Sequence, residues 1–142
     1  TGGTSDFGPE MLHAAAQGQP YQCFVGPDAK IPFMAMPDAV ESMIALLEAD
    51  RARLRSTVYN VGAFSVSARE IEARVKKAFP KAQITYVPDA VRAKIVDSWP
   101  EDVDDARARE DWGWKAAYSW ERAFDEYLVP SIQKRYSEPP PK

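Results

Sequence analysis

The chain has very few of the residues that build disulfides, zinc sites or nucleophilic triads. Its 142 residues include a single cysteine, Cys23, and a single histidine, His13. A single cysteine excludes an intrachain disulfide. Cys23 and His13 together supply only two ligands, too few for a zinc site made of cysteine and histidine. A Ser-His-Asp triad would depend on His13, and the sequence has no G-x-S-x-G turn to hold its serine. We therefore expect His13 to be an ordinary helix residue.

The motifs that bind nucleotide cofactors are also missing. The sequence contains no G-x-G-x-x-G and no P-loop, and none of its six tyrosines is followed four residues later by a lysine. A nicotinamide cofactor would have no glycine-rich turn on which to place its phosphates. The sequence therefore predicts no catalytic, cofactor-binding or metal-binding residue within this chain.

Long apolar runs and an excess of positive charge are absent as well. No apolar segment approaches the ~20 residues that cross a bilayer. Eighteen basic and 21 acidic residues give a net charge of −3, which offers no general attraction to nucleic acid or anionic lipid. The 45% hydrophobic and 27% charged residues are typical of one globular domain, so neither nucleic acid nor a membrane is an expected partner.

What is present is an alternation of short helices and short strands. Apolar spacing and turn residues predict helices near 9–17, 38–48, 68–79, 90–96, 106–112 and after Ser119, and strands near 21–25, 57–61 and 82–87. Residues 31–36 are expected to form a buried stretch rather than a central strand, because Pro32 cannot donate a hydrogen bond. This alternation predicts a small α/β lobe.

Two helices carry stronger signals than the others. Val40, Met43, Ile44 and Leu47 fall at i, i+3, i+4 and i+7, which predicts that one side of the helix near 38–48 faces the core. The string Ser67-Ala68-Arg69-Glu70 has the form of a capping box and predicts a helix start.

The opening segment, TGGTSDF, combines two glycines with a cluster of polar side chains. Such a loop at residues 1–7 is typical of one edge of a binding site, and we expect the other edge to lie in a preceding part of a larger enzyme. Asp6 has two interpretations, a ligand-facing carboxylate or a cap for the helix that follows.

Five segments, in this order, resemble one family of enzymes. They are GGTSDF (2–7), KIPFMAMPDAV (30–40), TVYNVGAFSVSAREI (57–71), PDAVRAKIVDSWP (88–100) and DDARAREDWGW (104–114). Together they resemble the C-terminal part of the short-chain-type L-threonine 3-dehydrogenases, which are extended short-chain dehydrogenase/reductases related to sugar-nucleotide epimerases and dehydratases. The similarity runs from Gly2 to about Tyr136, with Trp112 where leucine is usual.

The resemblance implies a two-part enzyme that oxidises L-threonine to 2-amino-3-oxobutanoate. Residues 1–136 would form its C-terminal substrate-binding lobe, an α/β unit of helices with a few short strands, and residues 137–142 a loose tail. An N-terminal Rossmann domain of the same protein, absent here, would bind NAD and supply a catalytic tyrosine-lysine pair. The complete enzyme would be a homodimer, in the cytoplasm of a bacterium or the mitochondrial matrix of a eukaryote, whereas this chain alone would be inactive.

The resemblance also suggests residues that touch the substrate. Threonine presents an ammonium, a carboxylate and a hydroxyl, so its pocket needs a negative group and hydrogen-bond donors. Asp6 would take the ammonium, Thr4 and Ser5 would take the carboxylate, and Trp99 would lie where the lobe closes over the substrate.

Two other functions are compatible with the sequence. One is a sugar-nucleotide epimerase or dehydratase, although such enzymes usually carry H-V-D-D where this chain has Met36-Pro37-Asp38. The other is a non-catalytic interaction lobe that covers a partner domain.

Overall fold

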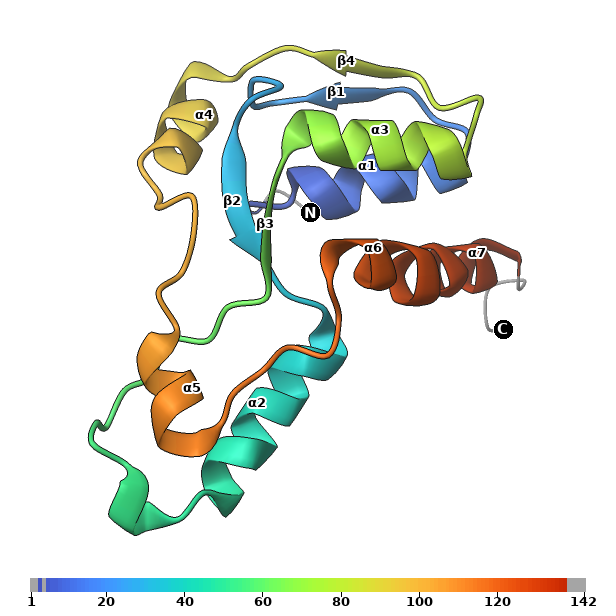
Figure 1. Ribbon diagram of the computed structural model, residues 1–142. Helices are drawn as coiled ribbons and strands as arrows, with labels where there is room; N and C mark the ends of the chain where they lie inside the picture. The colour runs from blue at the N-terminus through green and yellow to red at the C-terminus, as the bar shows by residue number, and fades with distance from the viewer. Residues whose placement is uncertain (1–2, 4, 138–142) are drawn as a thin grey trace.

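A computed structural model of the protein describes residue 3 and residues 5–137. Thr1, Gly2, Thr4 and residues 138–142 lie outside the described residues, and with them one predicted substrate-binding residue and most of the predicted tail. The described helices and strands confirm the expected α/β class, with helices predominating (Figure 1).

Two separate pairs of strands organise the lobe. Strand β1 (Tyr21–Cys23) pairs in parallel with β4 (Ile84–Tyr86), and β2 (Lys30–Phe33) pairs antiparallel with β3 (Phe64–Ser67). The prediction for residues 31–36 was wrong in part, since Ile31 to Phe33 do form a strand. Pro32 is tolerated because this pair has only two strands, so its ring nitrogen lies on an edge.

The core lies between these strands and three helices, α1 (Phe7–Ala16), α3 (Ala68–Ala78) and α7 (Val129–Ser137). Figure 1 shows α1 and α3 alongside the β1–β4 pair, with α6 and α7 on the other side of them. The Phe7 ring packs edge-on against Phe24 and Phe33, with centroids 6.2 and 5.9 Å away. The largest fully buried side chains are Phe7, Phe124, Met11, Ile31, Val25, Val75, Val96 and Cys23.

The capping box before α3 is confirmed. The Ser67 hydroxyl accepts a hydrogen bond from the Glu70 amide, and the Glu70 carboxylate accepts one from the Ser67 amide. These bonds satisfy amides that have no partner inside the helix, and they lower the pKa of Glu70.

The last helix, predicted to start after Ser119, continues past Pro130. It begins as α6 (Trp120–Arg122), widens into a π-helical segment, η2 (Ala123–Leu128), and continues as α7 past Pro130. Proline in a regular helix lacks an amide and clashes with the carbonyl four residues before it, and a π-helical turn relieves both problems. Pro130 therefore widens this helix instead of ending it. Near its end, Tyr136 hydrogen-bonds His13 of α1, with 2.8 Å between the hydroxyl oxygen and Nδ1.

The other end of the lobe is formed by α2 (Met36–Glu48), a short 3-10 helix, η1 (Arg51–Arg53), and α5 (Ala106–Trp112), which lie together in the lower part of Figure 1. Asp38, in the first turn of α2, is almost completely buried. Its two carboxylate oxygens accept hydrogen bonds of 2.9 and 3.0 Å from the amides of Ala117 and Tyr118. One carboxylate thus ties α2 to the segment that leads into α6.

Two predictions at this end were wrong. Residues 57–61 do not form a strand, because no described strand lies beside them to exchange hydrogen bonds. The helix near 38–48 exists, but its apolar side faces outward: Val40, Met43, Ile44 and Leu47 are all exposed. In the part of the chain that the structure describes, every helix is too short or too polar to cross a membrane.

Candidate functional site

The opening loop folds back on itself just before α1. The Asp6 carboxylate accepts a 3.0 Å hydrogen bond from the Gly3 amide, and the Asp6 main-chain oxygen accepts a 2.8 Å bond from the Glu10 amide inside the helix. A β-carbon on Gly3 would lie 2.7 Å from Cγ of Asp6, so only glycine fits here without moving the carboxylate. The Asp6 side chain does not cap α1; it holds the loop in place.

Arg92 of α4 (Ala90–Asp97) is hydrogen-bonded to this loop. Nη2 of Arg92 donates a 2.7 Å hydrogen bond to the Gly3 carbonyl. The guanidinium carbon lies 3.3 Å from the centroid of the Phe24 ring, a cation–π arrangement on a buried aromatic side chain. Asp89 caps the helix by accepting hydrogen bonds from the amides of Val91 and Arg92, and these bonds lower its pKa. Three contacts therefore hold Arg92 in position: its hydrogen bond to the Gly3 carbonyl, its stacking on Phe24 and the cap that Asp89 forms on its amide.

Trp99 follows α4 and lines an open groove. The helical path continues through Ser98, and the Trp99 amide donates a 3.0 Å bond to the Val96 carbonyl. The indole is 40% exposed and borders a hollow of about 380 Å³. The other lining residues are Gly26, Pro27, Asp28, Ala29, Lys30, Val96, Asp97 and Glu101. The wall carries three carboxylates and one ammonium, and one of the carboxylates, Asp28, is paired with Arg69 at 2.9 Å.

The loop and the groove border the same side of α4. Arg92, Val96 and Trp99 are spaced by four and three residues, so they share one face of the helical path. Seven residues at a rise of 1.5 Å put the two ends roughly 10 Å apart. Between Arg92 and Trp99 on this face lies Val96, whose side chain is buried, with 1% of it exposed.

Of the predicted substrate-binding residues, the structure brings Asp6 to Gly3 and, through Gly3, to Arg92. Ser5 and Asp6 are half-buried, and among the described residues neither one lines the groove that holds Trp99. Thr4 lies outside the described residues. The loop and Trp99 thus lie near the two ends of α4, and among the described residues they do not line one common pocket.

No pattern in the sequence singled out Arg92. It lies inside the segment 88–100 that carries the family resemblance, but its partner Gly3 is 89 positions away, and no spacing rule links residues so distant. The pattern of a helix predicts which residues share a face and not which loop will meet that face.

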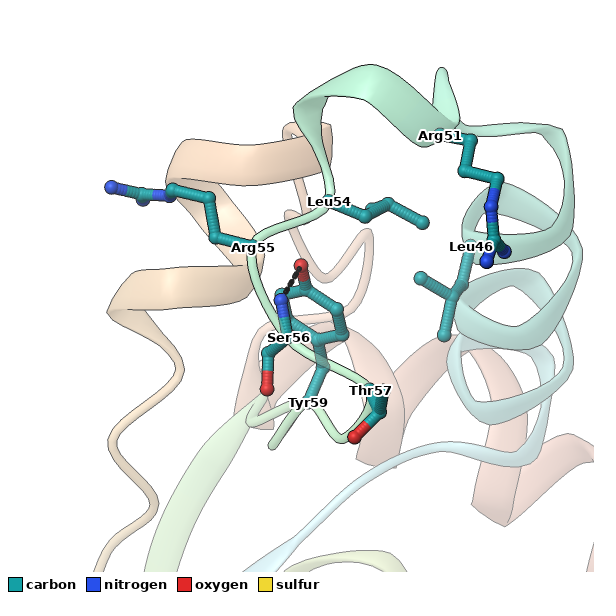
Figure 2. A pocket seen from close by; sticks show the side chains of 7 residues that line it. All are labelled: Leu46, Arg51, Leu54, Arg55, Ser56, Thr57 and Tyr59. Atoms are coloured by element: carbon teal, nitrogen blue, oxygen red, sulfur yellow. Dashed lines mark hydrogen bonds between the residues drawn. The ribbon is translucent and has the colours of Figure 1, made fainter.

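A second hollow, of about 670 Å³, opens at the far end of the lobe between α2 and the residues after η1. Its lining residues are Leu46, Arg51, Leu54, Arg55, Ser56, Thr57 and Tyr59, and Figure 2 shows the Arg55 side chain directed away from it. The Tyr59 hydroxyl accepts a 3.2 Å bond from the Ser56 amide and donates a 2.6 Å bond to Asp111. The residues that line this hollow include no histidine, cysteine or carboxylate. Burial and the hydrogen bond to Asp111 raise the pKa of Tyr59, which keeps this hydroxyl protonated near neutral pH.

Asp111 anchors the chain beside this second hollow. Its side chain is 2% exposed and also accepts bonds from the main-chain amide and Nε of Arg55. The hydroxyl of Tyr59 and the guanidinium of Arg55 lower the pKa of Asp111 to about 2. No group of three or more potential metal ligands is found among residue 3 and residues 5–137.

Comparisons with known proteins link the lobe to one group of enzymes, although no protein-family model matches the chain. It is 38% identical over 114 residues to the mitochondrial L-threonine 3-dehydrogenase of Bos taurus, which covers 80% of this chain and 31% of that protein. It is 34% identical over 135 residues to an uncharacterized epimerase/dehydratase of Staphylococcus haemolyticus, covering 94% of this chain and 42% of that protein.

Solved structures show the same relationship. The holo form of a GalE-like L-threonine dehydrogenase from Cupriavidus necator superposes with a TM-score of 0.84 and 38% identity, over 96% of this chain and 42% of that one. A UDP-glucose 4-epimerase from Thermotoga maritima superposes with a TM-score of 0.72 at 15% identity, which shows a shared fold only. The chain therefore spans less than half the length of these relatives.

Proposed function

Because this chain corresponds in sequence and fold to the C-terminal part of L-threonine 3-dehydrogenases of the extended short-chain dehydrogenase/reductase type, we propose that it forms the substrate-binding part of an NAD-dependent enzyme that oxidises L-threonine at C3. The observation that carries the proposal is the 30–39% identity to L-threonine dehydrogenases over 80–98% of this chain, among curated relatives and solved structures alike.

In this proposal the N-terminal part holds the cofactor, since this chain has no glycine-rich turn for the phosphates of a nucleotide. Bound NAD would accept the hydride that leaves C3 of threonine, and the hydroxyl proton would pass to a base in the same N-terminal part. The residues of the present chain bind and orient the substrate and exclude water.

The individual roles follow from the opening loop and from Trp99. The Asp6 carboxylate pairs with the substrate ammonium, and the hydroxyls of Thr4 and Ser5 contribute to the carboxylate side of the pocket. Arg92 acts as a positioning residue, because it holds the carbonyl of Gly3 and so fixes the loop that carries Asp6. Trp99 closes over the substrate from the other end of α4.

The experiment uses a joined protein, in which residues 1–142 replace the aligned C-terminal part of the Cupriavidus necator enzyme. Reduction of NAD is followed with L-threonine, and conversion of UDP-glucose is assayed in parallel. Turnover of threonine without conversion of UDP-glucose is the expected result, and the reverse pattern would contradict the proposal. The chain alone should show no turnover and no micromolar binding of NAD by calorimetry.

A second candidate function is favoured by one observation. The staphylococcal relative named as an epimerase/dehydratase matches a larger share of this chain than the bovine threonine dehydrogenase does, at slightly lower identity. Conversion of a sugar nucleotide by the joined protein would support this alternative. Assembly of the complete enzyme as a homodimer stays a prediction that sedimentation of the joined protein tests.

A further inference from the structure

In the part of the chain that the structure describes, the last turn of α7 is hydrogen-bonded to α1 through one side chain, that of Tyr136. Val129 and Ile132 pack against the core, and Tyr136 continues the same face of the helix at a spacing of three and four residues. Residues 133–135 and 137 are exposed. The Tyr136 ring meets His13 edge-on, with 5.7 Å between the ring centroids. Docking of this turn therefore depends on the polar contact between Tyr136 and α1.

The hydrogen bonds in this contact assign a donor and an acceptor to each atom. Nε2 of Gln17 donates to the Tyr136 hydroxyl oxygen and to the His13 main-chain oxygen, both at 3.1 Å. The hydroxyl still has its own proton to give, and Nδ1 of His13 lies 2.8 Å away. A neutral imidazole accepts this proton at Nδ1 when its own proton is on Nε2, whereas a protonated ring is a donor at both nitrogens. Protonation would therefore take away the acceptor that the hydroxyl now has.

The surroundings of His13 also disfavour a proton on its ring. His13 lies in the last turn of α1, where the helix dipole favours a positive charge. Burial of the imidazole and the nearby guanidinium of Arg135 on α7 outweigh that effect and lower the pKa of His13 from its ordinary value of 6.5.

The carboxylates on the elements around His13 are engaged elsewhere. Glu10, one turn earlier on α1, accepts a 2.9 Å bond from the Tyr21 hydroxyl of β1. Glu72 of α3, which also packs against α1, is bonded to a lysine and a tyrosine side chain. Among residue 3 and residues 5–137, none of the ion pairs includes His13. No described carboxylate therefore compensates a charge on this ring.

We propose that His13, Gln17 and Tyr136 form a pH-sensitive clasp, which docks the last turn of α7 onto α1 while His13 is neutral and releases it when the ring binds a proton. The contact is complete above pH 6.5 and is lost as the pH falls below that value, because the folded chain binds this proton less readily than the unfolded chain does. The clasp lies at the end of α1 opposite the opening loop, so its action does not depend on the proposed reaction.

The test follows the 142-residue chain between about pH 5 and about pH 8. Amide hydrogen exchange reports on residues 133–137, and NMR reports on His13, whose ring gives a single titration curve because the chain has no other histidine. Protection of residues 133–137, corrected for the effect of pH on free amides, should fall roughly fivefold as the ring takes up its proton, which is what one net hydrogen bond contributes. Val75, a buried residue of α3, is the internal reference and should keep its protection.

Two variants separate the clasp from other effects of acid. Tyr136→Phe keeps the ring and removes the hydroxyl, so protection of the last turn should be low over the whole range and should not follow the titration of His13. His13→Gln cannot take up a proton and should remove the pH dependence. Tyr127→Phe is the matched control, since it removes a hydroxyl from another tyrosine of the same helical run, and it should behave as the parent does.

Several results would overturn the clasp. One is unchanged protection of residues 133–137 while His13 titrates, and another is the same pH response in Tyr136→Phe as in the parent. A His13 midpoint at or above 6.5 would show that the contact does not favour the neutral ring. Loss of protection at Val75 together with the last turn would assign the pH effect to unfolding of the whole lobe.

Discussion

Arg92 and Gly3 are joined by a 2.7 Å hydrogen bond across 89 positions of the chain, from a guanidinium in α4 to a main-chain carbonyl in the opening loop. The same guanidinium stacks on Phe24, so the loop is held against the core by one side chain with two kinds of contact. A main-chain acceptor makes the contact independent of the loop's side chains.

Replacing Arg92 should loosen the loop without unfolding the lobe. In the joined protein, Arg92→Ala should raise KM for threonine by roughly tenfold, equivalent to about 1.4 kcal/mol, with a smaller effect on kcat. Arg92→Lys should recover little, because an ammonium does not stack on a ring as a planar guanidinium does. Lys94→Ala, an exposed change on the same helix, is the control. An unchanged KM in Arg92→Ala would remove Arg92 from the site.

Trp99 should affect both kinetic constants. Trp99→Ala should raise KM for threonine and lower kcat, by roughly 10-fold or more in kcat/KM, because a side chain that closes over the substrate contributes to orientation as well as binding. Trp99→Phe should retain most of the activity. The free energy of unfolding, measured by urea titration, should change little because the indole is 40% exposed. A loss of stability that parallels the loss of activity would indicate a structural role instead.

Asp38 should be a stability residue. Its removal in Asp38→Ala leaves the amides of Ala117 and Tyr118 without an acceptor, at roughly 1–3 kcal/mol for each buried group. Urea unfolding of the chain should show this loss, and Asp38→Asn should lose less because it keeps one acceptor oxygen. Glu41→Ala, an exposed change in the same helix, should stay within about 0.5 kcal/mol of the parent. A stable Asp38→Ala variant would show that α2 is held by other contacts.

Asp111 should make the lobe sensitive to acid. Its pKa is about 2 in the folded chain and 3.8 ordinarily, so the folded state favours the ionised form. The resulting stabilisation is complete above the ordinary value and is lost as the pH falls from about 4 toward about 2. Other carboxylates with lowered pKa values contribute in the same range, so the measurement is the difference between the parent and Asp111→Asn in unfolding free energy against pH. That difference should shrink as the pH falls through this window, and parallel curves would contradict the assignment.

The sequence predicted most of the local structure, because local rules control it. The capping box at Ser67 and Glu70 and the strands around Tyr21 and Ile84 depend on neighbours a few residues away, and the structure confirms them. The failures involve contacts with distant or absent partners. Residues 57–61 have a strand composition and no strand beside them, and the helical spacing of Val40 to Leu47 predicted an apolar face correctly but not what covers it.

In the candidate site too, local motifs identified some residues, and a contact between distant segments was missed. Asp6 and Trp99 were selected from short motifs, and the motifs do lie at the two ends of one side of α4. Whether their side chains meet one substrate stays a prediction, since part of the opening loop lies outside the described residues. Arg92 could not be selected, because its role depends on a carbonyl that any residue type would provide.

The parallel pairing of β1 with β4 also determines when the lobe can become complete during synthesis. Between these strands the chain passes through β2, α2, η1, β3 and α3, so the ribosome must release all of them before Cys23 can meet Tyr86. Contacts between distant segments form late, because a long loop must close first. Helix α4 follows β4 directly, and Arg92 can therefore reach the opening loop only after most of the polypeptide has emerged. The hydrogen bond from Arg92 to Gly3 therefore forms late in folding. A nascent chain stalled before α4 would have an opening loop without this contact.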